Sequence, residues 1–345
     1  MVPIVPSDLV EYPIINYFKF RNRGKIIDKD LSHSLISVYT KYYRKDPRKF
    51  FLENFKLKTI SIKWSKPIPH RKFVQSTGQT KSSYKPLSPL FQDHKYFPVS
   101  HMLTHRYTFD DGQESTCAVL FIHGYAETTF FFHELSYFRI MRQIFKSDIF
   151  SMELPYHFHR QPTDSPFSGA YFLNGNPVRM LEAIRQSIQE ILLLTNYLKD
   201  RYNRVVLFGV SLGGHIAALS TQFLTDVEII CALASPFIFN LNPKIVPIST
   251  EIVSQLRKRG QINWYKILYV CNLKYFSPFT TNYHTAIIGG RFDRIVQFIK
   301  VQNLAKLLDK PLFSYPGGHL SLIFWLRSLL NLITKHNIRT IRRLK

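Results

Sequence analysis

Cysteine is scarce in this chain of 345 residues. The three cysteines, Cys117, Cys231 and Cys271, are scattered within apolar segments and show no C-x-x-C spacing. This pattern indicates neither a disulfide framework nor a cysteine-based zinc site. We expect three buried thiols.

Long apolar runs are also missing. The most apolar late stretch, Leu320 to Ile333, is interrupted by polar residues and is shorter than the roughly 20 apolar residues that span a bilayer. It predicts a core helix. Because no basic cluster precedes an apolar run near Met1, we expect no secretory signal and take the cytoplasm as the default location.

Acidic residues are few, with 23 Asp and Glu against 46 Lys and Arg, which gives a net charge of +23. Residues 1–100 carry a net charge of +12 and residues 325–345 carry +6, so the middle of the chain is only mildly basic. Such charge attracts phosphate-bearing partners, which include anionic membrane surfaces, nucleic acid and acidic substrates. A solvated basic surface on a chain rich in lysine is an equally good interpretation.

The length allows one catalytic domain of roughly 200 to 250 residues and an extension of about 100. In residues 1–100 we expect one or two helices between 28 and 55, where Pro47 interrupts the pattern, and an irregular proline-rich arm at 65–98. Residues 101–335 alternate strands and helices, which predicts an α/β fold with a mostly parallel sheet covered on both faces. Residues 336–345 are expected to form a basic tail.

The expected elements of the catalytic domain follow from apolar runs and helical spacing. Strands are predicted at 104–109, 115–122, 149–154, 205–210, 228–234, 285–288 and 311–315. Helices are predicted at 130–145, from 181 to about 202, and after residue 211.

The strongest motif is Gly209-Val210-Ser211-Leu212-Gly213, which follows a very apolar strand and precedes a helical stretch. A G-x-S-x-G between a strand and a helix is the arrangement that presents a nucleophilic serine on a tight turn. A serine in a glycine-rich loop can instead be a simple turn residue or helix cap. The strand before it and the helix after it favour Ser211 as a nucleophile.

A serine hydroxyl needs a base, and the base needs a group that fixes its tautomer. Asp293 and His319 each follow a predicted strand, in the chain order Ser, Asp, His. We therefore predict Asp293 as the acid and His319 as the base. The alternatives are an aspartate paired with a neighbouring arginine at the surface and a histidine with a purely structural hydrogen bond.

The tetrahedral intermediate of such a reaction carries a negative charge that backbone amides can stabilise. One amide is expected from Leu212, and another from Tyr125, with Gly124 beside it, in the loop after an early apolar strand. His123 in the same loop is expected to shape the loop rather than to act as a second base.

These four blocks, at 121–127, 209–215, 289–296 and 316–320, resemble the α/β-hydrolase superfamily in order and spacing. The resemblance covers about residues 104–335 and implies an α/β-hydrolase fold. Pro155-Tyr156 looks like the start of the variable insertion in a poorly characterised branch with esterase-like and peptidase-like members. If the superfamily plan holds, 156–176 and 236–283 form the pocket wall and lid.

The leading hypothesis is a serine esterase or lipase-like enzyme that forms an acyl-enzyme, with an acyl ester or lipid as substrate and no cofactor. A peptidase or an acyltransferase would use the same residues. A non-catalytic adaptor for membrane or nucleic acid is a third hypothesis, against which the complete Ser, Asp and His set argues. No metal is predicted, because His157 and His159 have no further ligands nearby in the sequence; lid residues are the preferred interpretation.

Overall fold

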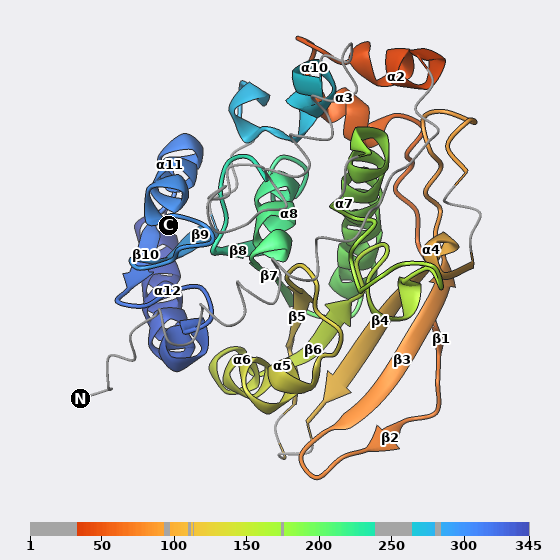
Figure 1. Ribbon diagram of the computed structural model, residues 1–345. Coiled ribbons are helices and arrows are strands. Elements are labelled where there is room, and N and C mark those ends of the chain that lie inside the picture. The colour runs from red at the N-terminus through yellow and green to blue at the C-terminus, as the bar shows by residue number, and fades with distance from the viewer. Residues whose placement is uncertain are drawn as a thin grey trace.

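The computed structural model describes residues 33–92, 97–109, 112, 114–173, 176–238, 264–279 and 284–344. These residues form one ten-stranded sheet with the order β1-β3-β4-β6-β5-β7-β8-β9-β10, in which β2 pairs with β3 (Figure 1). The strands are β1 (Lys63–Trp64), β2 (Ile68–Pro69), β3 (Val74–Lys81), β4 (His101–Thr108), β5 (Cys117–Ile122), β6 (Ser147–Met152), β7 (Arg204–Val210), β8 (Glu228–Ala232), β9 (Thr285–Gly290) and β10 (Leu312–Tyr315).

The six strands from β6 to β10 in the sheet order are parallel to one another, whereas β3 and β4 are antiparallel to their neighbours. Every residue of β5 is buried, as expected for the centre of a parallel sheet that is covered on both faces. The prediction of a mostly parallel α/β sheet is confirmed.

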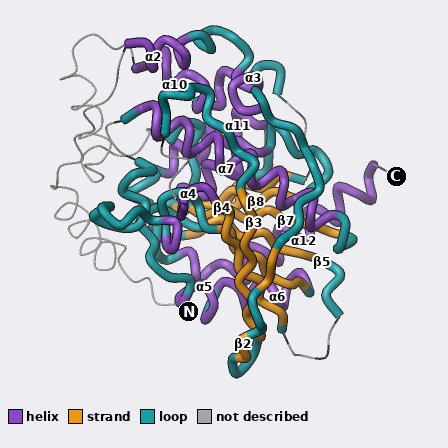
Figure 2. Tube along the Cα trace, turned by 90° about the vertical axis from the view of Figure 1, so that its right-hand side faces the viewer, coloured by secondary structure: helices purple, strands orange, loops and turns teal. Residues whose placement is uncertain are grey.

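Helices cover both faces of this sheet, as Figure 2 shows. Alternate residues of β5 enter two separate cores: Ala118 and Leu120 pack with α7, α8 and α11, whereas Val119 and Phe121 pack with α6 and α12. The helices are α2 (His33–Thr40), α3 (Pro47–Leu52), α4 (Phe97–Ser100), α5 (Phe131–Leu135), α6 (Tyr137–Phe145), α7 (Pro177–Lys199), α8 (Leu212–Ser220), α10 (Trp264–Leu268), α11 (Phe298–Leu308) and α12 (Leu322–Leu344). The described residues also form three short 3-10 helices, η2 (Phe158–Arg160), η3 (Tyr269–Cys271) and η4 (Leu273–Tyr275).

The three cysteines are free and buried, as predicted. The helix predicted at 130–145 is divided into α5 and α6, because Ser136 leaves helical geometry with φ −127° and ψ −73°. Pro47 begins α3 instead of ending a helix. Proline suits the first position of a helix, and the Asp46 side chain accepts a hydrogen bond from the Arg48 amide there (3.0 Å).

The segment expected to be an irregular arm is more regular than its composition indicates. β3 pairs antiparallel with all of β4, from Val74 opposite Thr108 to Lys81 opposite His101. Periodicity missed this strand because its residues are mostly polar, and pairing with β4 decides its conformation. The sheet thus extends across position 100, while the division of the chain into domains there stays a prediction. Residues 336–344 of the expected tail continue α12.

Helix α7 is buried along both its apolar and its polar side, because the N-terminal residues cover it. Glu182 accepts hydrogen bonds from the hydroxyls of Tyr39 (2.5 Å) and Tyr84 (2.6 Å). Arg185 donates to the carbonyls of Phe50 (2.8 Å) and Lys85 (2.7 Å). Polar contacts with α7 therefore hold the described part of the N-terminal third, residues 33–92, against the rest of the fold.

Candidate active site

Ser211 lies on a sharp turn between β7 and α8 and has the positive φ of 56°, with ψ −113°. This strained conformation is expected for a nucleophile on a strand-to-helix turn. A side chain at position 209 would place its Cβ 2.1 Å from the Gly213 carbonyl oxygen, so the turn requires glycine there. The Ser211 amide donates to the Ala232 carbonyl (2.9 Å) and thereby fixes the turn to the neighbouring strand.

Asp293 and His319 follow the adjacent parallel strands β9 and β10, so their loops meet at one edge of the sheet. The distance between Asp293 Oδ2 and His319 Nδ1 is 2.8 Å. The other carboxylate oxygen, Oδ1, accepts the backbone amides of Ile295 and Val296, each at 2.8 Å. The Asp293 side chain is fully buried. This geometry differs from the alternative of a surface aspartate paired with an arginine.

The contact with Asp293 determines which His319 nitrogen is available for chemistry. A carboxylate oxygen accepts a hydrogen from Nδ1, and the Nε2 lone pair is then left to take a proton. Tyr315 supports this loop, because its hydroxyl donates to the Gly318 carbonyl at 2.7 Å. Sequence reasoning did not find Tyr315, which lies at the end of a predicted strand and carries no motif of its own.

The loop after β5 adjoins Ser211: a Cβ added to Gly124 would lie 3.6 Å from the Ser211 Cβ. The Gly124 amide, however, donates to Glu127 Oε1 at 2.6 Å. Gly124 was predicted beside the oxyanion hole. Its amide hydrogen is used in this contact within the loop and stabilises the loop conformation. Tyr125 and Leu212, the first residue of α8, stay the proposed oxyanion donors.

Both ring nitrogens of His123 are engaged with backbone. Nδ1 lies 2.7 Å from the Gly124 carbonyl oxygen, and Nε2 accepts the Leu154 amide at 3.0 Å. Burial lowers the pKa of His123 to about 4, so the ring is neutral at physiological pH. His123 therefore shapes the loop, as the sequence predicts.

Glu127 is a site residue that sequence reasoning missed. Its second carboxylate oxygen contacts Nε2 of His133 on α5. Burial of Glu127 raises its pKa, but His133, His123 and the Gly124 amide together more than offset this effect, and the pKa lies below its usual value. The available signal was a glutamate three residues after a glycine in the loop, which is the spacing that closes a side-chain-to-amide turn.

The predicted insertion packs against this loop. Ser168 donates a hydrogen bond to the Glu127 carbonyl, and the Tyr125 hydroxyl lies 3.5 Å from the Leu173 carbonyl oxygen. The insertion thus lies where the predicted pocket wall is expected. Of the second predicted lid segment, residues 239–263 and 280–283 lie outside the described residues.

His157 and His159 lie in different environments. His157 is buried, with Nδ1 2.9 Å from the Pro155 carbonyl oxygen. His159 is largely exposed and contacts Glu153, which also contacts His105. The structure thus brings His159 together with Glu153, which follows β6, and with His105 of β4.

The sheet order, the turn at Ser211 and the Asp293–His319 pair at the same sheet edge define an α/β-hydrolase fold. Solved structures with similar folds include an acetyl xylan esterase from a Paenibacillus species, with a TM-score of 0.57 and 10% identity over 90% of this chain and 96% of that one. An S-formylglutathione hydrolase from Agrobacterium tumefaciens gives a TM-score of 0.53 and 12% identity over 79% of this chain and 98% of that one. An acetyl xylan esterase from a Thermoanaerobacterium species gives a TM-score of 0.52 and 11% identity over 87% of this chain and 92% of that one.

At these identities the likeness establishes the fold alone. No family model and no curated protein matches the sequence.

Proposed function

We propose that this protein is a serine hydrolase that cleaves a carboxylic ester through an acyl-enzyme. The observation that carries the proposal is the buried Asp293–His319 contact on the sheet edge where Ser211 occupies its strained turn. A structural histidine needs neither a fully buried carboxylate partner nor a strained serine at the same edge.

In the proposed mechanism Ser211 Oγ attacks the ester carbonyl while His319 Nε2 takes its proton. Asp293 holds the ring and stabilises the imidazolium that forms. The amides of Leu212 and Tyr125 stabilise the oxyanion. His319 then protonates the leaving alcohol, and a water activated by the same nitrogen hydrolyses the acyl-enzyme and regenerates Ser211.

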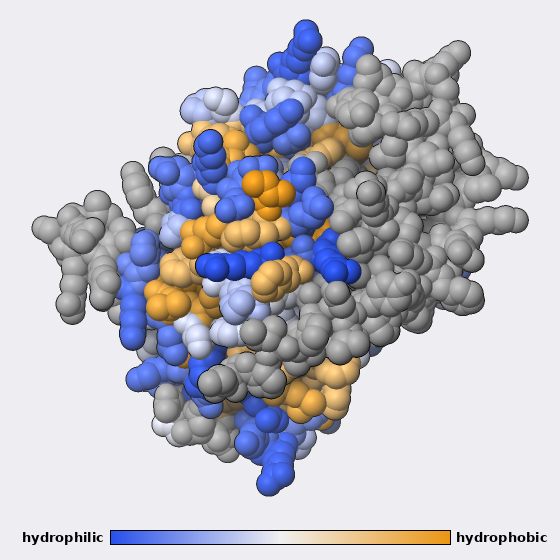
Figure 3. Space-filling view, turned by 60° about the vertical axis from the view of Figure 1, so that its left-hand side comes forward, coloured by the Kyte–Doolittle hydropathy of each residue, from blue (hydrophilic) through white to orange (hydrophobic). Residues whose placement is uncertain are grey.

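An ester is preferred over other acyl compounds because two of the similar structures named above are esterases. A lipid substrate is a finer proposal. It is favoured by exposed apolar side chains such as Phe292, directly before Asp293, which is 56% exposed. Figure 3 shows hydrophobic side chains exposed among hydrophilic ones on one face of the molecule.

The test is a hydrolysis screen with acyl esters of graded chain length, beside phospholipids and peptides. Under the proposal the parent enzyme hydrolyses at least one ester class, and Ser211→Ala does not. Cleavage of peptides without esters would favour a peptidase, and acyl transfer to an added alcohol in preference to water would favour an acyltransferase.

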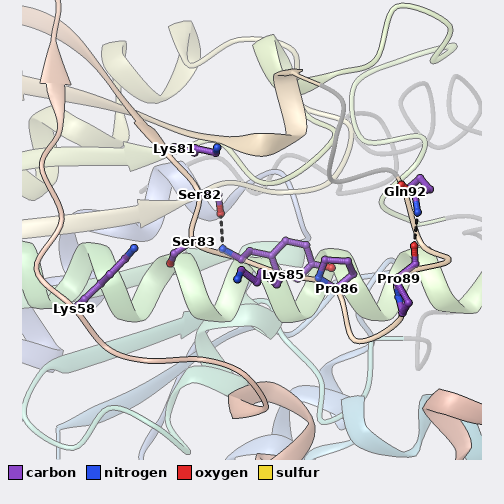
Figure 4. Close-up of a pocket in the computed structure, with 9 residues that line it drawn as sticks. Lys58, Lys81, Ser82, Ser83, Lys85, Pro86, Pro89 and Gln92 are labelled. Atoms are coloured by element: carbon purple, nitrogen blue, oxygen red, sulfur yellow. Dashed lines mark hydrogen bonds between the residues drawn. The ribbon is translucent and has the colours of Figure 1, made fainter.

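Attraction to an anionic membrane surface is a second proposal, with a cytoplasmic location. Lys58, Lys81 and Lys85 line an open cavity of about 670 Å³ between separate N-terminal segments (Figure 4). Its lining residue Ser82 contacts Glu190 of α7 at 2.7 Å, which anchors the cavity to the fold. Three lysines around one cavity favour a phosphate-bearing head group. In the part of the chain that the structure describes, no helix has the length and apolar character of a bilayer span.

A further inference from the structure

Two histidines and a glutamate from three different elements converge, and none of them belongs to the proposed triad. His105 comes from β4, Glu153 directly follows β6, and His159 lies in η2. His105 Nε2 and His159 Nδ1 lie 2.7 and 2.8 Å from the same oxygen, Glu153 Oε1. Among the described residues, their potential ligand atoms all lie within 4.8 Å of one another.

This spacing is close to that of a metal site. With Zn–N bonds of about 2.0 Å and Zn–O bonds of about 2.1 Å, tetrahedral ligand atoms lie roughly 3.3 Å apart. The two short contacts must therefore open by about half an ångström. His159 can open its own contact, because its side chain is 76% exposed, whereas the contact between the buried His105 and Glu153 needs a small shift of one of these two side chains.

Neighbouring groups hold His105 and Glu153 by hydrogen bonds, as is usual for the side chains that bind a metal ion. Thr77 Oγ1 lies 3.2 Å from His105 Nδ1, so a proton on Nδ1 leaves the Nε2 lone pair directed at the cluster. The His159 amide donates to Glu153 Oε2 at 3.0 Å, which fixes the carboxylate and leaves Oε1 for the metal. Both features match the way in which ligating histidines and carboxylates are usually held.

We propose that His105, Glu153 and His159 bind one Zn²⁺ ion, with solvent as the fourth ligand on the exposed side of His159. Two imidazoles and one carboxylate suit zinc in charge and donor type. The proposal does not depend on the chemistry of Ser211.

A bound ion would tie the insertion to the sheet. His159 lies in the segment that continues to Ser168, and Ser168 donates to the Glu127 carbonyl beside Gly124. Zinc would thus join β4, the end of β6 and the start of the insertion that packs on the loop beside Ser211. We therefore infer a structural role in which zinc holds this insertion in place.

The experiment measures Zn²⁺ binding to the full chain, without a histidine tag, by equilibrium dialysis against a competing chelator. The parent is expected to bind one ion. His159→Ala removes an exposed ligand that folding does not need, and it should weaken binding by at least about tenfold. Thr77→Val should weaken binding by about tenfold, because loss of an outer partner typically costs 10- to 100-fold. His70→Ala is the matched control, since His70 is exposed and lies outside the cluster.

A second readout separates binding at this cluster from binding elsewhere on the surface. Zinc should raise the thermal unfolding temperature of the parent and of His70→Ala, but not that of His159→Ala. Equal zinc affinity in the parent and His159→Ala would overturn the proposal, and so would the absence of binding by the parent. In either case the cluster is a hydrogen-bonded support for Glu153.

Discussion

The edge of the sheet that carries the proposed triad, called the catalytic edge below, and the described part of the N-terminal third, residues 33–92, are built in different ways. At the catalytic edge, short contiguous motifs place Ser211, Asp293 and His319 on turns that directly follow parallel strands. In the N-terminal third, partners lie far apart in sequence: Tyr39 contacts Glu182, 143 residues away. Local turns thus specify the proposed chemistry, whereas long-range polar contacts hold the N-terminal third in place.

The largest effect is expected when one side chain of the proposed triad is removed. We expect Ser211→Ala and His319→Ala each to lower kcat/KM for an activated ester by on the order of 10³ or more, while the fold is retained. The measurement is initial hydrolysis rate, with circular dichroism as the control for folding. Activity within about tenfold of the parent in either variant would contradict the triad.

The N-terminal third should respond in stability rather than in chemistry. Glu182→Gln leaves Arg185 without its carboxylate partner and places an amide donor near two hydroxyl donors. We expect a loss of about 3 kcal/mol in the free energy of unfolding, measured with urea. The control is Asp226→Asn, which breaks an exposed ion pair with Lys199 and should cost less than about 1 kcal/mol. Equal effects of the two variants would show that the buried network does not hold the N-terminal third.

Buried neutral histidines make the free energy of unfolding depend on pH. Burial lowers the pKa of His215 on α8 from 6.5 to about 4, as it does for His123. Between these values the unfolded chain binds protons that the folded protein does not, so stability falls as pH drops from 6.5 toward 4. His215→Leu should reduce this loss by on the order of 2 kcal/mol. Urea unfolding at pH 7 and pH 4.5 measures this loss of stability. If the parent and His215→Leu lose the same free energy of unfolding between the two pH values, His215 does not have the lowered pKa.

A further prediction concerns the basic residues of the C-terminal segment. Removal of Lys335, Arg339, Arg342, Arg343 and Lys345 should weaken sedimentation with anionic vesicles at low salt, since each basic residue near such a surface contributes about 1 kcal/mol. Turnover of a small soluble ester should hardly change.

A parallel variant, with Lys58, Lys81 and Lys85 changed to alanine, tests the N-terminal cavity instead. Equal sedimentation of the parent and both variants would favour a solvated basic surface. The difference should also shrink as salt is added, because exposed charges are screened beyond about 8 Å at physiological ionic strength.

The sequence predicted the turn at Ser211 and the strand-end positions of Asp293 and His319 because the determinants of these features are local. The Gly209 requirement, the strand before Ser211 and the strand-end positions of Asp293 and His319 can each be identified within a few residues. β3 escaped prediction, since a polar strand has no apolar alternation and depends on its partner β4.

The rest depended on contacts that no local pattern encodes. The polar side of α7 suggests exposure, yet residues of the N-terminal third bury it. His105 and Glu153 are 48 residues apart, so their approach to His159 follows only from the pairing of β4 with β6. The hydrogen bond from the Gly124 amide to Glu127, by contrast, is local, and its three-residue spacing was an available signal.

The central claim, an activated Ser211, is tested most directly by covalent labelling. A fluorophosphonate probe reacts with a serine only where a base and an oxyanion site activate it. We predict a single adduct on Ser211, located by peptide mass spectrometry, that is absent from Ser211→Ala and strongly reduced in His319→Ala. A folded parent that stays unlabelled, or is labelled equally in Ser211→Ala, would contradict the account.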